Sequence, residues 1–348
     1  MSEQVLVRRV GDIGWLSLNR PKVIHALNLA MVETMIEALL EWRDDPTVAA
    51  VVIDHAEGRG FCAGGDIAML RHSALSDDGM AGRRFFFREY QLNHLIKTWP
   101  KPVIAFMNGI TMGGGVGLAG PAQIRIATEQ TRFAMPETGI GLFPDVGGGW
   151  YLSRLPGRLG QYLALTGARL DGGECLRAGL ATHHVPSGAL PEIKRAIAGC
   201  PADIERILED AKTIPPVTEQ PGRGAEIDRL FAPDTLEGIL AALGEDGGPF
   251  ARDTLAVLTS RSPLSCKVSL RELAQSAALA DFADEMAMEY RIASRILVLP
   301  DFAEGVRAVI VEKDNAPRWT WPTASDVTDD LLDAIFSPLD HKEEWRPL

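Results

Sequence analysis

The sequence contains few of the residues that build disulfide or metal frameworks. Its 348 residues include four cysteines, and no two of them form a CxxC pair or another metal-ligand spacing. No HExxH zinc motif occurs either. The four cysteines are Cys62, Cys175, Cys200 and Cys266. We therefore expect reduced, structural cysteines and no metal site.

Long apolar runs and an excess of positive charge are also missing. No apolar stretch reaches the ~18 residues of a membrane-spanning helix, and the start, MSEQVLVRRVGD, has no cleavable leader pattern. The 35 basic and 47 acidic residues leave a net charge of −12, which argues against a nucleic-acid or anionic-membrane surface as the main partner. We expect a cytosolic protein that acts on a small molecule, in which a local basic pocket for a phosphorylated ligand is still possible.

Two common ligand or catalytic motifs are absent, and a third is present in an unsuitable context. No GxxxxGK[ST] loop and no GxSxG elbow occur, which excludes a P-loop nucleotide site and the common serine-hydrolase arrangement. Gly115, Gly117 and Gly120 do satisfy the dinucleotide pattern GxGxxG after an expected strand. Pro121 follows at once and would shorten the helix that should carry the pyrophosphate, so we reject a dinucleotide site.

The chain does contain a regular alternation of strand-like and helix-like segments in its first ~190 residues, which predicts an α/β fold. The expected strands are Val5–Val10, 14–18, 48–53, 102–107 and 123–127. The expected helices are 29–40, which Asn28 caps, and 83–99, 159–166, 173–178 and 191–197.

The pattern becomes mostly helical from about residue 201. The helices expected there are 202–213, 235–243, 270–280 and 282–297. We expect residues 1–200 to form the core that carries the site. Residues 201–348 should form a mainly helical extension that packs on this core.

Two glycine-rich turns could place backbone N–H groups around a ligand. CAGGD covers residues 62–66, and MGGGVGL covers residues 112–118. Glycine lets a ligand approach the backbone closely, and free N–H groups at the start of a helix can stabilise a developing oxyanion. The residues alone leave two interpretations open, an oxyanion hole or two tight turns in a crowded fold.

Two carboxylates lie in a run that is otherwise apolar or rich in glycine and proline. Glu137 and Asp145 occur in MPETGIGLFPDVGGG, residues 135–149, with no Lys or Arg between them. Ionised carboxylates are rare in apolar surroundings unless a partner or a reaction uses them. From the residues alone, the two acids either carry out catalysis or accept hydrogen bonds from backbone N–H groups of the glycine turns.

CAGGD, MGGGVGL, MPE and a downstream GG turn together resemble the enoyl-CoA hydratase/isomerase (crotonase) family. The resemblance implies the ClpP-like crotonase fold, a spiral of ββα units, which holds the carbonyl of an acyl-CoA thioester between two backbone N–H groups. In this sequence they would be those of Gly65 and Gly114. The residues that the resemblance places along CoA are His25, Ala63, Gly64, Asp66 and Ile67.

Within this family the resemblance narrows to hydrolases. Hydratases place two glutamates at the thioester, whereas this chain keeps Glu137 and has Gly117 at the other position. It has Asp145 where hydratases usually have glycine. FPDVGG, together with FFFREYQLNHLI, YLALTGARL, RAGLATH and DFAEGVRAVIVEKDNAPRW, resembles the branch that hydrolyses 3-hydroxyisobutyryl-CoA in valine breakdown, and the similarity covers nearly the whole chain.

That resemblance implies a role for each acid. Glu137 would be the base or the nucleophile, and Asp145 would position Glu137 or the water and assist proton transfer. Glu89, in FREYQL, would contact the hydroxyl end of the substrate. CoA would be part of the substrate, no metal or redox cofactor is implied, and a homo-oligomer is possible.

Two alternatives stay open at this point. The first is an enoyl-CoA hydratase or isomerase of the same fold. Gly117 disfavours the hydratase because only one of the two usual acids is present, whereas Asp145 leaves an isomerase or a lyase possible. The second is a non-catalytic CoA-binding subunit, which would leave both acids of the apolar turn without a use.

Overall fold

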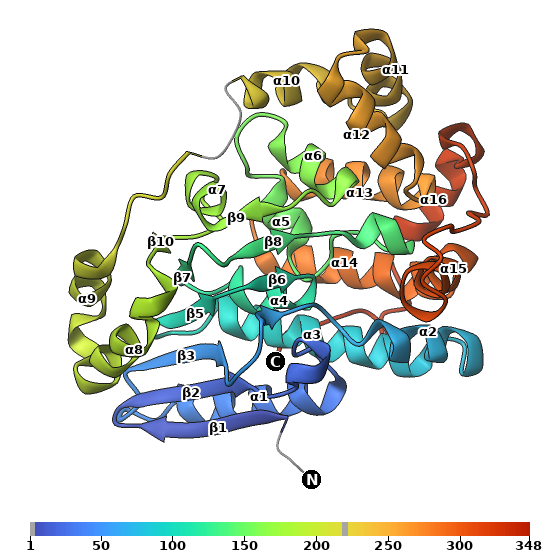
Figure 1. Cartoon of the computed structure of the whole chain (residues 1–348). Helices are drawn as coiled ribbons and strands as arrows, with labels where there is room; N and C mark the ends of the chain where they lie inside the picture. The colour runs from blue at the N-terminus through green and yellow to red at the C-terminus, as the bar shows by residue number, and fades with distance from the viewer. Residues whose placement is uncertain (1–3, 218–221) are drawn as a thin grey trace.

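The computed structural model describes residues 4–217 and 222–348 (Figure 1). Its ten strands are β1(Val5–Val10), β2(Ile13–Leu18), β3(Ala50–His55), β4(Gly60–Cys62), β5(Val103–Met107), β6(Ile110–Met112), β7(Ile124–Ala127), β8(Arg132–Ala134), β9(Leu170–Asp171) and β10(His183–His184). They form a six-stranded sheet in the order β1-β2-β3-β5-β7-β10 and a four-stranded sheet in the order β4-β6-β8-β9. β1 pairs with β2 and β8 with β9 in antiparallel fashion, and the other pairs are parallel.

Helices follow or separate these strands. Those before residue 200 are η1(Pro21–Val23), α1(Leu29–Arg43), α2(Ile67–Ser76), α3(Met80–Lys97), α4(Gly114–Ala119), η2(Glu137–Ile140), α5(Gly148–Leu152), α6(Leu159–Thr166), α7(Gly172–Arg177), η3(Ser187–Ala189) and α8(Leu190–Gly199). Those after it are η4(Pro201–Asp203), α9(Ile204–Ala211), α10(Arg223–Leu230), α11(Leu236–Asp246), α12(Pro249–Thr259), α13(Pro263–Ser276), α14(Phe282–Ile296), α15(Pro300–Val306), the π-helical turn η5(Arg307–Val311), η6(Ala324–Asp326) and α16(Asp329–Phe336).

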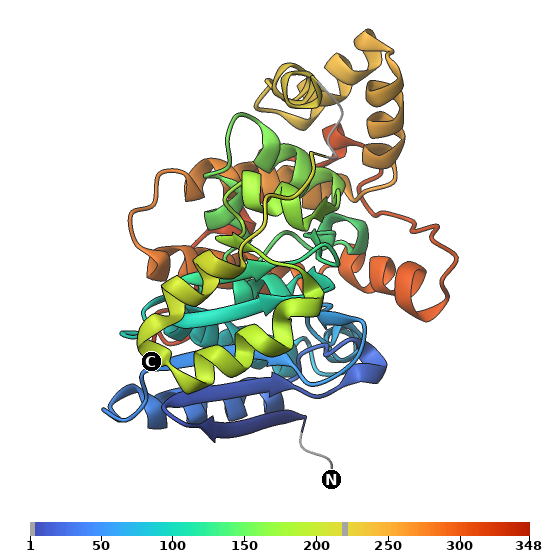
Figure 2. The same cartoon turned by 60° about the vertical axis from the view of Figure 1, so that its left-hand side comes forward.

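The larger sheet is covered on both faces, which explains the continuous apolar runs of its strands. Alternate residues such as Ile104 and Phe106 pack with apolar residues of α8 and α9, the yellow-green helices in front of the sheet in Figure 2. The residues between them, such as Val103 and Ala105, belong to the main core with α1 and α3. The predicted α/β fold is confirmed.

Most predicted elements lie within a few residues of their expected positions. The hairpin pairs Val5 with Leu18, and the Asn28 side chain accepts a hydrogen bond from the Met31 N–H at 3.0 Å, as expected for a helix cap. The helix predicted to begin at residue 270 instead begins at Pro263, because Ser262 caps it and proline suits its first turn. The short strands of the smaller sheet were not predicted.

Among the described residues after 200 no strand occurs, and helices predominate. The main apolar core includes side chains from both parts, for example Leu92 of α3 and Met286 of α14. The division of the chain at residue 200 stays a prediction. The cysteines Cys62, Cys175 and Cys266 are buried, and Cys200 is exposed. In the part of the chain that the structure describes, no helix is both long and apolar enough to cross a membrane.

Candidate active site

One cavity gathers most of the predicted site residues. It has a volume of about 270 Å³ and is bounded by residues of α2, α3, η2, η5 and the start of α4. The predicted residues that line it are Ala63, Gly64, Gly65, Ile67, Glu89, Gly114, Glu137 and Asp145. Residues far apart in the sequence thus meet at one site, as the resemblance implied.

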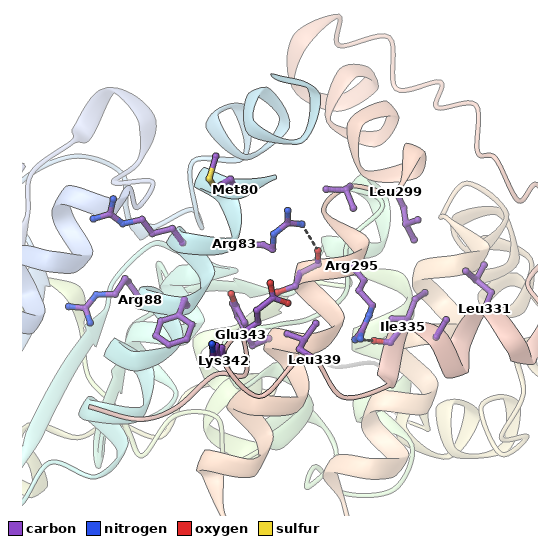
Figure 3. A pocket seen from close by; sticks show the side chains of 16 residues that line it. Met80, Arg83, Arg88, Arg295, Leu299, Leu331, Ile335, Leu339, Lys342 and Glu343 are labelled. Carbon is purple, nitrogen blue, oxygen red and sulfur yellow. Dashed lines mark hydrogen bonds between the residues drawn. The ribbon is translucent and has the colours of Figure 1, made fainter. Parts of the chain in front are cut away.

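A larger cavity of about 780 Å³ lies between α3, α14, α16 and the C-terminal segment (Figure 3). Its wall combines apolar side chains such as Leu331 and Ile335 with the cations Arg83 and Arg295. Arg295 donates to the backbone carbonyls of Ile335 and of the segment that follows. None of the predicted site residues lines this cavity. The buried acids therefore identify the smaller cavity as the candidate site.

The two glycine turns lie against each other and offer two unused donors. A Cβ built on Gly113 would lie 3.3 Å from Gly64 Cα. Gly64 has φ +121° and Gly113 has φ +47°, a region that favours glycine. Among the described residues no hydrogen-bond acceptor is present for the N–H of Gly65 or of Gly114, although the adjacent Gly64 carbonyl accepts from Leu27 N–H at 2.8 Å. Both residues line the cavity, so the two N–H groups are candidates for an oxyanion site.

Three acids project from different elements into this cavity: Glu89 from α3, Glu137 from η2 and Asp145 from the loop before α5. They are 2%, 5% and 5% exposed. Glu89 Oε1 and Glu137 Oε2 have no hydrogen-bond partner among the described residues, and Asp145 Oδ2 accepts from the Tyr90 hydroxyl at 2.8 Å. This arrangement does not support the alternative that Glu137 and Asp145 accept hydrogen bonds from backbone N–H groups of the glycine turns.

Burial controls the protonation of these acids. It raises the pKa of Asp145 to about 7, partly offset by the Tyr90 hydrogen bond that favours the ionised form. Burial, and then the charge of Asp145, raise the pKa of Glu137 and of Glu89 well above the usual value. A carboxyl group whose pKa is raised in this way can act as a general acid or base.

Gly117 leaves no room for the second acid of a hydratase. A Cβ at this position would lie 2.6 Å from Val146 Cβ and 2.9 Å from Asn93 Nδ2. Val146 has φ +56°, which a β-branched residue rarely adopts.

The helix α4 that contains Gly117 ends at Ala119, as expected from the proline that follows, and is too short for a dinucleotide site.

His25 and Asp66 lie near the cavity but do not line it. The ring of His25 is fully buried, with Nδ1 accepting from Arg20 N–H at 2.9 Å and Nε2 2.8 Å from the Glu57 carbonyl oxygen. Asp66 caps α2 and forms an ion pair with Arg20 at 3.3 Å. Both side chains are thus engaged within the protein, and the CoA contacts of His25 and Asp66 stay a prediction.

The sequence did not single out several residues of the site. Tyr90 follows Glu89 directly. The only sequence signal for its role was the general rule that a buried tyrosine hydroxyl usually has a hydrogen-bond partner. Arg261, Val309 and Ile310 line the cavity from the C-terminal region. No local pattern connects those three residues with the glycine turns.

Comparison with known proteins places this chain among acyl-CoA enzymes. The family model described as enoyl-CoA hydratase/isomerase matches residues 13–336. The 3-hydroxyisobutyryl-CoA hydrolase of Gallus gallus is 39% identical over 97% of this chain and 90% of its own length.

Animal relatives are named as mitochondrial proteins, which shows that the predicted cytosolic location is wrong. That prediction depended on a missing leader pattern, which does not determine location.

Two solved structures resemble the whole chain. A carnitinyl-CoA dehydratase from Mycobacterium thermoresistibile is 39% identical, with a TM-score of 0.94 over 99% of both chains. An enoyl-CoA hydratase from Rhodobacter sphaeroides is also 39% identical, with a TM-score of 0.91 over 99% of this chain and 100% of its own. The predicted crotonase fold is therefore confirmed, and the chain belongs to the enoyl-CoA hydratase/isomerase family.

Proposed function

We propose that the protein hydrolyses 3-hydroxyisobutyryl-CoA to 3-hydroxyisobutyrate and free CoA, a step of valine breakdown. The hydrolases of this name at 39–41% identity over nearly the whole chain support the proposal. The observation that carries it is the pair of acids, Glu137 and Asp145, in one cavity with two unused backbone N–H groups. A thioester hydrolase needs such a base beside an oxyanion site.

In the proposed mechanism the N–H groups of Gly65 and Gly114 bind the thioester oxygen and stabilise the charge that develops on it. If Glu137 is the base, it takes a proton from water while the water oxygen bonds to the carbonyl carbon. The C–S bond then breaks, and the proton passes to the CoA sulfur. Asp145, held by the Tyr90 hydroxyl, positions the water and exchanges protons with Glu137.

Glu137 can also attack directly. Its oxygen then forms a mixed anhydride with the acyl group, and the CoA thiolate leaves with a proton from Asp145. Water cleaves the anhydride, which restores the Glu137 carboxylate and returns a proton to Asp145. Both routes consume one water and release one acid and one thiol. Neither needs a metal or a redox cofactor, and CoA enters and leaves with the substrate.

The two solved structures are named as a dehydratase and a hydratase, so hydration of an enoyl-CoA is the main alternative reaction. Gly117 argues against it, because Val146 and Asn93 occupy the space that a second glutamate would need. A non-catalytic CoA-binding subunit is less consistent with the site, since burying three acids costs free energy that binding alone does not require. A homo-oligomer stays a prediction.

Replacing Gly114 by alanine should disturb the oxyanion site. The new Cβ would lie 2.7 Å from Glu89 Oε1, 3.2 Å from Leu27 Cδ1 and 3.3 Å from the Gly64 carbonyl carbon, so Glu89 or the two glycine turns would have to shift. We expect kcat for thiol release to fall by about 10²–10³-fold, the usual effect of losing one such donor. Thermal unfolding of the variant would check the fold. A folded variant with wild-type kcat would show that the close packing around Gly114 is not needed for the reaction.

The substrate is tested by comparing 3-hydroxyisobutyryl-CoA with isobutyryl-CoA, which lacks the hydroxyl group. Glu89 Oε1 is buried in the cavity and has no hydrogen-bond partner within residues 4–217 and 222–348, so a substrate hydroxyl can hydrogen-bond there. We expect wild-type kcat/KM to favour the hydroxylated thioester by at least about 10²-fold, because the other substrate leaves Glu89 unsatisfied. Glu89→Leu should remove most of this preference. Equal rates on the two thioesters would contradict the proposed substrate.

A further inference from the structure

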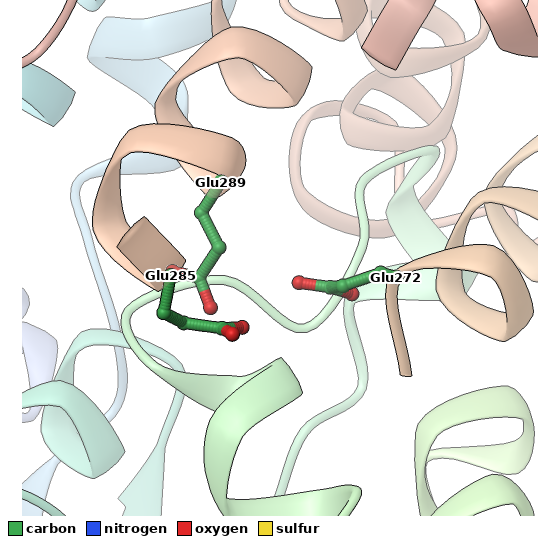
Figure 4. A group of neighbouring side chains, drawn as sticks. All are labelled: Glu272, Glu285 and Glu289. Carbon is green, nitrogen blue, oxygen red and sulfur yellow. The ribbon is translucent and has the colours of Figure 1, made fainter. Parts of the chain in front are cut away.

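Three carboxyl side chains from the C-terminal helices lie behind the loop that carries Asp145. They are Glu272 of α13 and Glu285 and Glu289 of α14, all fully buried. One oxygen of each lies within 4.8 Å of the other two. Figure 4 shows Glu285 and Glu289 on one helix and Glu272 pointing toward them from another. The proposed chemistry above uses none of these three residues.

Glu289 holds the backbone of the Asp145 loop. Its two carboxylate oxygens accept from the Gly147 N–H at 3.0 and 2.9 Å. Glu285 instead accepts from the Ser276 hydroxyl at 2.7 Å, and neither oxygen of Glu272 has a hydrogen-bond partner among the described residues. Of the three acids, Glu289 therefore contacts the residue two positions after Asp145.

The backbone segment that Glu289 contacts has an unfavourable conformation. Val146 has φ +56° and Gly147 has φ +88°, so two consecutive residues adopt the left-handed region. For a β-branched residue this conformation is unfavourable, and it persists only where the surrounding structure fixes it. The Gly148 N–H closes the turn by donating to the Asp145 carbonyl at 2.8 Å, and the Gly147 N–H ties it to Glu289. Losing its acceptor would let the loop relax and move Asp145.

The next residue of α14 contacts Tyr90, the residue that donates to Asp145. The ring of Tyr290 contacts that of Tyr90 edge to face, with centroids 6.4 Å apart and an interplanar angle of 88°. Tyr90 in turn donates its hydroxyl to Asp145. Two consecutive residues of one helix thus support Asp145, Glu289 through the loop backbone and Tyr290 through Tyr90.

We propose that Glu289 is a positioning residue for the thioester hydrolysis, which fixes the Val146–Gly147 turn so that Asp145 faces Tyr90 and Glu137. The inference deepens the proposed function and rests on it. It gives the helical region after residue 200 a part in the reaction, although that region supplies neither of the two reacting acids. Burial raises the pKa of Glu289 well above its usual value, so an amide is a close substitute for its neutral form.

The test compares Glu289→Met with Glu289→Gln. Methionine keeps the volume but has no oxygen for the Gly147 N–H, whereas glutamine keeps one acceptor. We expect Glu289→Met to lower kcat by about 10–100-fold, the effect of a small misplacement of a catalytic group. KM should change little, and Glu289→Gln should recover most of the rate. The acid limb of the pH–rate profile should also move in Glu289→Met, because the charge of Asp145 raises the pKa of Glu137.

Glu272→Met is the matched control, since it removes a carboxyl group from the same buried cluster without touching Gly147. We expect its kcat to stay near the wild-type value. A folded Glu289→Met with the kcat and pH profile of Glu272→Met would overturn the positioning role. If Glu289→Met does not fold, Glu289→Ala is compared with Glu272→Ala in the same way. Failure of the wild-type protein to release thiol would instead refute the proposed function itself.

Discussion

Replacing Glu137 by glutamine should lower kcat for thioester hydrolysis by about 10³-fold, within the range for loss of a general base. Glutamine has nearly the same shape, so CoA-thioester binding should persist and KM should change little. The amide cannot take a proton from water at neutral pH, and it cannot form the mixed anhydride. Single-turnover thiol release, with binding measured separately, separates the loss of chemistry from a loss of affinity.

A matched control for this variant is Glu272→Gln. Glu272 is also a fully buried glutamate, and burial raises its pKa well above the usual value, but it lies outside the cavity. Its replacement should leave kcat near the wild-type value. A Glu137→Gln protein that releases thiol at the wild-type rate would show that Glu137 is neither the base nor the nucleophile.

Replacing Asp145 by asparagine should lower kcat by about 10²-fold or more, because a partner in proton transfer is lost. The same variant should change the pH dependence. The charge of Asp145 raises the pKa of Glu137, so removing that charge lowers this pKa. Glu137 then becomes ionised at lower pH, and the acid limb of the residual kcat/KM profile should move toward lower pH.

The direction of this shift is the decisive part of the measurement. The Tyr90 hydroxyl loses its carboxylate acceptor in Asp145→Asn but can still donate to the amide oxygen, so the loop should stay in place. A residual activity whose acid limb is unchanged would mean that Asp145 does not influence the base. A limb that moves to higher pH would contradict the proposed coupling of the two acids.

Features encoded by local rules could be predicted from the sequence. Asn28 caps its helix by accepting from a nearby N–H, and Pro121 limits α4, because both effects depend on residues a few positions apart. The glycine turns could be recognised because close backbone contact demands glycine. Glu137 and Asp145 stood out because acids are rare in such an apolar segment.

The remaining parts of the site depend on contacts between distant segments. Tyr90 meets Asp145 across 55 positions, and Glu289 meets Gly147 across 142. No helical or strand period connects such residues, so periodicity cannot reveal them. Glu289 lies on α14, which was correctly predicted as a helix, but its sequence alone does not show which loop the buried face contacts.

The most direct test of the proposed hydrolase follows free thiol from 3-hydroxyisobutyryl-CoA and, separately, the enoyl absorbance of crotonyl-CoA with the same purified protein. We expect thiol release from the first thioester and no hydration of the second, since Gly117 leaves no space for a second acid beside Glu137. Loss of the enoyl absorbance without thiol release would contradict the hydrolase and make Glu137 the single acid of a hydratase.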